Sequence, residues 1–159
     1  MKKILLLAFI LTSSMLSFGQ SEGPELGVRF GGGFTGFSAV DFVYPVSDVN
    51  RLQFDLGFGN NFLSIDGLYE WQFDIGENFV VYPGFGAGFY SSSYRVYDNR
   101  KFRDETYRSS SVVLLGVIGI EYQIQPVPLT VGLDFRPSFG FNSYYGYGSV
   151  GALMVRYRF

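Results

Sequence analysis

Apolar and polar side chains alternate residue by residue over most of this chain, and this alternation limits the fold more than any other feature of the sequence. Between Arg51 and Phe58 every second residue is apolar, and the pattern repeats between Leu129 and Arg136. A period of two is typical of β-strands, whose successive side chains point to opposite faces. The sequence therefore predicts an all-β fold of eight strands, at Glu25–Gly33, Ser38–Val46, Arg51–Phe58, Leu63–Phe73, Phe79–Tyr90, Ser111–Ile124, Leu129–Ser138 and Ser149–Phe159.

The first 19 residues have the composition of a secretory signal peptide. Two lysines precede the apolar run Ile4–Leu11, and Ser17-Phe18-Gly19 fits the small-x-small rule for signal cleavage. The apolar run is shorter than a membrane-spanning helix requires. We therefore expect residues 1–19 to be cleaved and residues 20–159 to form one domain. The alternative is that the segment is a buried N-terminal helix.

The predicted connections between strands favour a closed, antiparallel, up-and-down barrel. Short turns at Ser47–Asn50, Asp74–Asn78 and Gln125–Pro128 alternate with connections that include a long polar one, Ser91–Ser110. Short turns at one end and longer loops at the other are typical of transmembrane β-barrels of the outer membrane. In such a barrel both termini and the short turns would be periplasmic, and Ser91–Ser110 would be a loop outside the cell.

Alternation alone does not show which face of the strands lies inside the barrel. A soluble lipocalin-like barrel is apolar inside, whereas a membrane barrel is polar inside. The polar face carries arginines and carboxylates but no lysine, and Lys101, the sole lysine of the mature chain, lies in the long loop. Enclosed ion pairs favour arginine, whose planar group binds two carboxylate oxygens. We therefore favour the membrane barrel, with these charged residues on the polar face: Arg29, Asp41, Asp55, Asp66, Glu70, Glu121, Asp134, Arg136, Arg156 and Arg158.

Glycines share the polar face with these charges. A solvated face would not need them, but a narrow lumen does, because large side chains from other strands must fit. The glycines expected inside are Gly27, Gly31, Gly57, Gly84, Gly86, Gly88, Gly119 and Gly132.

Aromatic residues gather near the predicted strand ends, as they do in the two girdles of a membrane barrel. One girdle would contain Tyr44, Trp71, Phe73, Phe79, Tyr122, Tyr157 and Phe159, and the other Phe58, Phe89 and Phe139. The last strand also ends on an aromatic residue. Its lipid-facing residues are similar to the signal that the β-barrel assembly machinery recognises, and we assign that role to Leu153, Val155, Tyr157 and Phe159.

The chain resembles the small eight-stranded outer-membrane barrels of the OmpA/OmpX-like superfamily, over the whole mature domain. The resemblance rests on Leu26-Gly-Val-Arg-Phe-Gly31, Gly67-Leu-Tyr-Glu-Trp71, Gly84-Phe-Gly-Ala-Gly88, Gly119-Ile-Glu-Tyr122, Asp134-Phe-Arg-Pro-Ser-Phe139 and Val155-Arg-Tyr-Arg-Phe159. It implies a porin-like fold in the outer membrane. It supplies no substrate and no catalytic residue.

The charges expected in the lumen suggest ion pairs that plug it, because an isolated buried charge is costly. The expected donors are Arg29, Arg136, Arg156 and Arg158, and the expected acceptors are Asp55, Asp66, Glu70, Glu121 and Asp134. The alternative is a polar path for passive transport of a small solute. A proline at position 83 would mark a bulge in its strand, because proline lacks the N–H that a strand ladder needs.

The composition argues against enzymatic chemistry, a thiolate metal site and nucleic-acid binding. The chain contains neither histidine nor cysteine, so the commonest general base and the thiolate metal ligands are missing. The mature chain has more acidic than basic residues, which argues against nucleic acid. We therefore expect a monomer without a cofactor, which contacts outer-membrane lipid and the assembly machinery. Its role would be structural or in surface interaction, with the ligand of the long loop undefined; a secreted lipocalin-like carrier remains the third reading.

Overall fold

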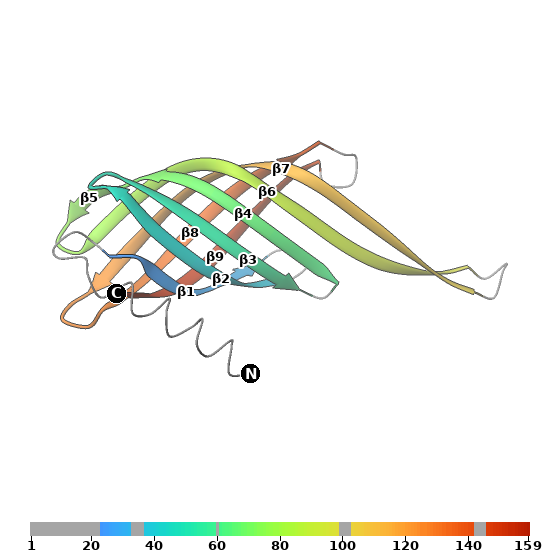
Figure 1. Cartoon of the computed structure of the whole chain (residues 1–159), viewed down its shortest axis with the longest axis horizontal. Helices are drawn as coiled ribbons and strands as arrows, with labels where there is room; N and C mark the ends of the chain where they lie inside the picture. The colour runs from blue at the N-terminus through green and yellow to red at the C-terminus, as the bar shows by residue number, and fades with distance from the viewer. Residues whose placement is uncertain (1–22, 33–36, 60, 99–102, 142–145) are drawn as a thin grey trace, which may run out of the picture.

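In the computed structural model, eight antiparallel strands close into a barrel with up-and-down order, as the alternation predicts (Figure 1). The structure describes residues 23–32, 37–59, 61–98, 103–141 and 146–159. The expected signal peptide, residues 1–19, lies outside the described residues. No helix within the described ranges is long and apolar enough to cross a bilayer.

The strands follow one another around the barrel in sequence order. Each pairs with its neighbour in the chain, and β1 pairs with the last strand. A pairing between β4 and β6 completes the ring, and the short β5 continues the line of β4 along β6 after a break at Gln72. The strands are β1 (Glu25–Gly32), β2 (Phe37–Ser47), β3 (Asn50–Gly59), β4 (Phe62–Trp71), β5 (Phe73–Gly76), β6 (Phe79–Asp98), β7 (Arg103–Ile124), β8 (Leu129–Gly140) and β9 (Tyr147–Arg158).

The two ends of the barrel differ. One end, called here the turn end, holds the start of β1, the end of β9 and the tight connections after β2, β5 and β7. In the turn between β5 and β6, Asn78 has a left-handed backbone (φ 69°), which asparagine tolerates better than most residues. The opposite end, called the loop end, holds the connections after β1, β3, β6 and β8 (Figure 1).

The prediction of a long loop at Ser91–Ser110 is wrong, because β6 and β7 continue through most of it. The barrel ladder of β6 with β4 ends at Ser92, and that of β7 with β8 begins at Val113. Beyond these points β6 and β7 still pair with each other up to Asp98 and Arg103. The resulting two-stranded extension, called here the hairpin, projects past the rest of the loop end (Figure 1). The hairpin extends beyond the apolar band that would contact lipid, so neither face of its strands needs to be apolar. Alternation therefore does not identify these strand segments.

The bulge expected at Pro83 is absent. Pro83 lies opposite Ile118, and the register of β6 with β7 is continuous along the whole pairing. The register shifts in the described strands occur instead near the turn end, between Pro45 and Ser47 and between Asp74 and Gly76.

The outward faces of the strands form a broad apolar surface. Phe54, Phe85 and Leu153 are 49%, 59% and 60% exposed, and other large apolar residues on every strand are similarly accessible. Such a contiguous surface marks contact with lipid rather than water. The lipocalin-like alternative is therefore wrong, because it requires the apolar residues inside.

Aromatic rings meet near both ends of this surface. Toward the turn end the ring centroids of Phe79 and Tyr122 lie 4.7 Å apart, and those of Tyr157 and Phe159 lie 5.1 Å apart. At the loop end Phe139 contacts Phe141 edge-on. The pattern agrees with the predicted girdles.

Candidate functional site: the barrel lumen

Arg51 is the centre of one group of ion pairs in the lumen. Its Nε lies 2.7 Å from Glu70 Oε2, and its two terminal nitrogens donate to both carboxylate oxygens of Glu121, at 2.7 and 3.0 Å. The guanidinium also lies over the ring of Tyr82, 4.2 Å from its centroid. These groups are almost fully buried. Arg51 lies near the start of β3, and its contacts join β3, β4 and β7 at the turn-end half of the barrel.

Arg156 extends this centre across the lumen from β9. Its Nε donates to Asp41 Oδ2 at 2.6 Å, and its Nη1 donates to Glu121 Oε2 at 2.9 Å. The same Nη1 lies 3.6 Å from Glu25 Oε2. Two arginines from different strands therefore share Glu121, so the pairs form a network rather than isolated bridges.

A second group of ion pairs centres on Asp134. Arg29 binds this carboxylate with two nitrogens, at 2.9 and 2.5 Å, and Arg136 Nη2 lies 3.1 Å from it. Arg136 also donates to Asp55 and lies 3.8 Å from Asp66 Oδ2. Asp66 has the longest ion pair of this group, and its Oδ1 accepts no hydrogen bond.

Gln53 connects the two groups. Its amide nitrogen donates to Asp41 Oδ1 at 2.8 Å and lies 3.4 Å from Asp55 Oδ1. Asp41 belongs to the Arg156 centre and Asp55 to the Asp134 centre. The polar lumen is therefore one continuous network.

The structure places eight of the nine predicted network residues in this network, but not Arg158. Arg158 lies at the turn end and is only partly buried. Its Nη1 donates to the Gln123 amide oxygen at 2.9 Å, and its Nη2 lies 3.4 Å from the carbonyl oxygen of Ile124. The expectation that Arg158 meets carboxylates is wrong: it lies opposite Glu25 in the register, but its guanidinium turns to the Gln123 amide and to backbone carbonyl oxygens instead. The network residues are Arg29, Asp55, Asp66, Glu70, Glu121, Asp134, Arg136 and Arg156.

Sequence reasoning left several lumen groups out of the network. Arg51 and Gln53 lie in phase with Asp55 on β3, and Glu25 lies in phase with Arg29 on β1. The period of two could therefore have found them. The alternation did not reveal Arg51, because Arg51 is the first residue of the predicted strand and no preceding residue sets the phase there.

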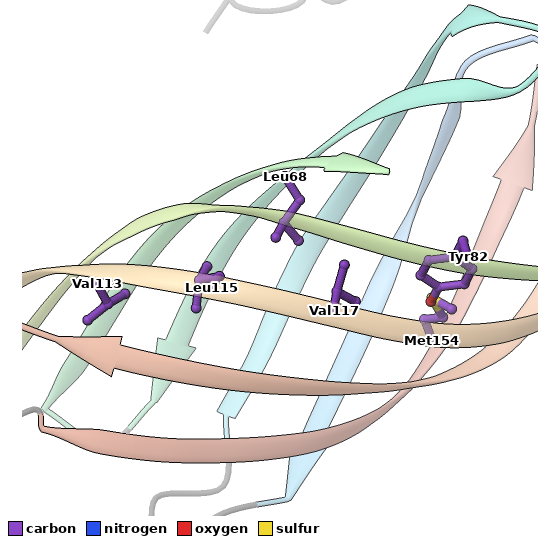
Figure 2. Close-up of a cluster of buried hydrophobic side chains, with 6 residues drawn as sticks. All are labelled: Leu68, Tyr82, Val113, Leu115, Val117 and Met154. Atoms are coloured by element: carbon purple, nitrogen blue, oxygen red, sulfur yellow. The ribbon is translucent and has the colours of Figure 1, made fainter. Parts of the chain in front are cut away.

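A cluster of buried apolar side chains also lies inside the barrel. Tyr82 and Met154 meet at the end of the cluster opposite Val113, and the tyrosine hydroxyl lies 3.4 Å from the methionine sulfur. Figure 2 shows how the cluster runs along the inside of the barrel. Its members are Leu68, Tyr82, Val113, Leu115, Val117 and Met154. The sequence did not predict this cluster, since Val113, Leu115 and Val117 sit in a stretch of β7 that is apolar on both faces.

Glycines make room for these side chains, as expected. A Cβ on Gly119 would overlap the Tyr82 ring, and one on Gly132 would overlap the Met154 methyl group. On β6, a Cβ at Gly84 would lie 2.8 Å from Glu70 Cγ and 2.9 Å from Val117 Cγ1. The lumen is packed at these positions, so any larger residue there must displace a neighbour.

The carboxylates of the lumen do not form a metal site. No group of three or more histidine, cysteine or acidic residues in the described part of the chain could hold a metal ion. The carboxylates instead face arginines, which is the arrangement expected of structural ion pairs.

No family model and no curated protein sequence matches the chain. Solved structures do match. The N-terminal barrel domain of Pseudomonas aeruginosa OprF is 13% identical, with a TM-score of 0.72, covering 86% of this chain and 96% of that domain. The fold is that of a small outer-membrane β-barrel.

Two further structures support the same architecture. Neisserial surface protein A is 15% identical, with a TM-score of 0.62, over 86% of this chain and 94% of its own. Ail, the attachment invasion locus protein of Yersinia pestis, is 13% identical, with a TM-score of 0.59, over 86% and 96%. At this identity the likeness concerns the fold, so the role of the lumen has to be judged from its own geometry.

Proposed function

We propose that this protein is a non-enzymatic barrel of the outer membrane with a closed lumen, which contributes to envelope structure and carries the hairpin at the cell surface. The observation that carries the proposal is the burial of the lumen residues. Asp41, Gln53, Glu70 and Arg156 are each 0% exposed. Side chains that line an open pore stay accessible to water, so this burial supports a lumen that is closed along the network.

The size of the barrel supports a closed interior. Eight strands leave a lumen that side chains can just fill. Here ion pairs occupy part of that space and the cluster around Tyr82 and Met154 occupies another part. Displacing either group to admit a solute would break buried ion pairs or hydrophobic contacts.

The hairpin supports the surface role. With the turn end in the periplasm, as in barrels of this type, the loop end and its hairpin face outward. The segment 91–110 also holds the sole lysine of the mature domain and carries more basic than acidic residues, unlike the rest of that domain. The names of two similar proteins, a neisserial surface protein and an attachment invasion protein, agree with such a role.

Single-channel recording in planar lipid bilayers tests the closed lumen. The refolded protein should give no steady conductance. A double variant with Arg51→Ala and Tyr82→Ala, which removes two neighbouring lumen side chains, should produce openings. The control variant with Phe85→Ala and Phe89→Ala changes two outward-facing residues and should stay closed. Steady openings of the unaltered protein would overturn the proposal.

Passive transport is the second candidate, and the charge of the lumen favours one form of it. The buried carboxylates are Glu25, Asp41, Asp55, Asp66, Glu70, Glu121 and Asp134, and the buried arginines are Arg29, Arg51, Arg136 and Arg156. The carboxylates outnumber the arginines, so a path through this lumen would select cations. In the same recordings, steady cation-selective currents of the unaltered protein would support this candidate.

A further inference from the structure

A pocket lies at the loop end, where the hairpin leaves the barrel. Its volume is about 290 Å³. It lies between the β3–β4 turn and the base of the hairpin, outside the lumen network. The residues that line it are Gly59, Asn61, Phe62, Leu63, Ser91, Ser92, Ser93 and Arg108.

Strand pairing holds these residues in place. Leu63 lies opposite Ser91, and Ser93 lies opposite Arg108. The backbone N–H of Ser93 donates to the carbonyl oxygen of Asn61 at 2.9 Å, which ties the turn to the hairpin. Phe62, which also lines the pocket, packs edge-on against Tyr90. The pocket is thus built on a ladder rather than on a loop.

The lining has the chemistry of a site for an anionic sugar. The hydroxyls of Ser91 and Ser93 and the Asn61 amide can bond to sugar hydroxyls, and the lining contains no carboxylate that would repel an anion. Arg108 is exposed, and in the described part of the chain no hydrogen bond or ion pair engages its guanidinium. An arginine free in this way suits phosphate, which accepts two parallel hydrogen bonds from it.

The height of the pocket indicates where the sugar comes from. Ile65 and Phe89 form the neighbouring outward-facing pair below Leu63 and Ser91, and both are exposed and apolar, at 53% and 44%. Two residues along a strand span about 7 Å. Ser91 therefore lies level with Leu63, which is still exposed and apolar, and the Ser93–Arg108 pair lies about 7 Å farther along the strand, where lipid headgroups replace lipid tails.

We propose that this pocket binds the phosphorylated sugar headgroup of a glycolipid in the surrounding leaflet. Arg108 binds the phosphate, and Asn61 and the serines bind the sugar. The acyl chains lie below, against Leu63 and Phe89. The site anchors the base of the hairpin to its lipid neighbours, and it is independent of whether the lumen is open or closed.

Native mass spectrometry of the detergent-purified protein tests this assignment. Diphosphoryl lipid A is the probe, its dephosphorylated form is the comparison, and glucosamine 6-phosphate is the soluble competitor. The unaltered protein should retain the diphosphoryl lipid, and Arg108→Gln should weaken retention roughly tenfold, as expected for loss of a charge-assisted bond. Arg108→Lys should recover part of the retention, since it restores the charge but not the two-pronged geometry.

The matched control is Arg158→Gln, which removes the same charge at the turn end and should retain the lipid like the unaltered protein. A second variant, Ser91→Ala with Ser93→Ala, should weaken retention without changing charge. Heat-modifiable gel mobility shows that each variant is folded. Equal retention of both lipids, an Arg108→Gln variant that retains lipid normally, or tighter binding of the soluble sugar phosphate than of the lipid would each overturn the assignment.

Discussion

Arg51 shows how far a single residue of the lumen affects its neighbours. It is the sole arginine that contacts Glu70 among the described ion pairs, and it shares Glu121 with Arg156. The type and the face of such residues could be predicted, since arginine and acids recur in phase along each strand. The pairs could not, because partners such as Arg29 and Asp134 are distant in sequence and meet only through the closed barrel.

Replacing Arg51 with methionine should destabilise the barrel by about 3–5 kcal/mol, because it leaves the buried Glu70 without its arginine and Glu121 with Arg156 alone. Urea unfolding of the refolded protein, followed by heat-modifiable gel mobility, measures the change. Arg158→Gln, where no ion pair is lost, should cost less than about 1 kcal/mol. Equal effects of the two substitutions would show that the network adds little to stability.

At the scale of single elements, the hairpin is an extension of the barrel rather than a part of its wall. The wall is complete without it, since β6 pairs with β4 up to Ser92 and β7 pairs with β8 from Val113. The alternation predicted the eight strands of the wall, because lipid and lumen impose opposite demands on its two faces, but it assigned most of the short β5 to the turn at Asp74–Asn78. It could not predict the extension, where both faces of the strands are polar in sequence.

Replacing residues 94–107 with a short Asn-Gly turn should therefore leave the barrel folded. The urea midpoint should stay within experimental error of that of the unaltered protein, while binding of whole cells to any surface that the hairpin recognises should fall. A shortened protein that fails to fold would show that the extension belongs to the folding unit.

The last strand, β9, carries the proposed assembly signal on its outward face and network residues on its inward face. Phe159→Ser should slow insertion by the assembly machinery in cells, while the purified variant refolds in detergent normally. Phe139→Ser is the control, because Phe139 is similarly exposed, 54% against 49%, but lies at the loop end. Pulse-chase measurement of heat-modifiable protein compares them, and equal delays would argue against a signal at Phe159.

For the whole molecule, the closed ring and its apolar exterior determine how the protein behaves in a cell. We expect it to remain with membranes after carbonate washing, to require detergent for extraction and to elute as a monomer by light scattering. Recovery in the soluble fraction would contradict the membrane barrel. This level was the most predictable from sequence, because it depends on the sum of many alternating residues and not on any one contact.

The hairpin has a geometric consequence for anything that approaches the cell. Asp98 lies six residues beyond Ser92 along β6, so the described part of the extension reaches about 20 Å along the strand. A large particle, such as a phage or an antibody, would touch this arm before it could touch the short β3–β4 turn beside the sugar pocket. Small molecules and membrane lipids can reach that pocket from the side. The hairpin therefore acts as a steric filter: small molecules reach the pocket at its base, and large particles are held away from it.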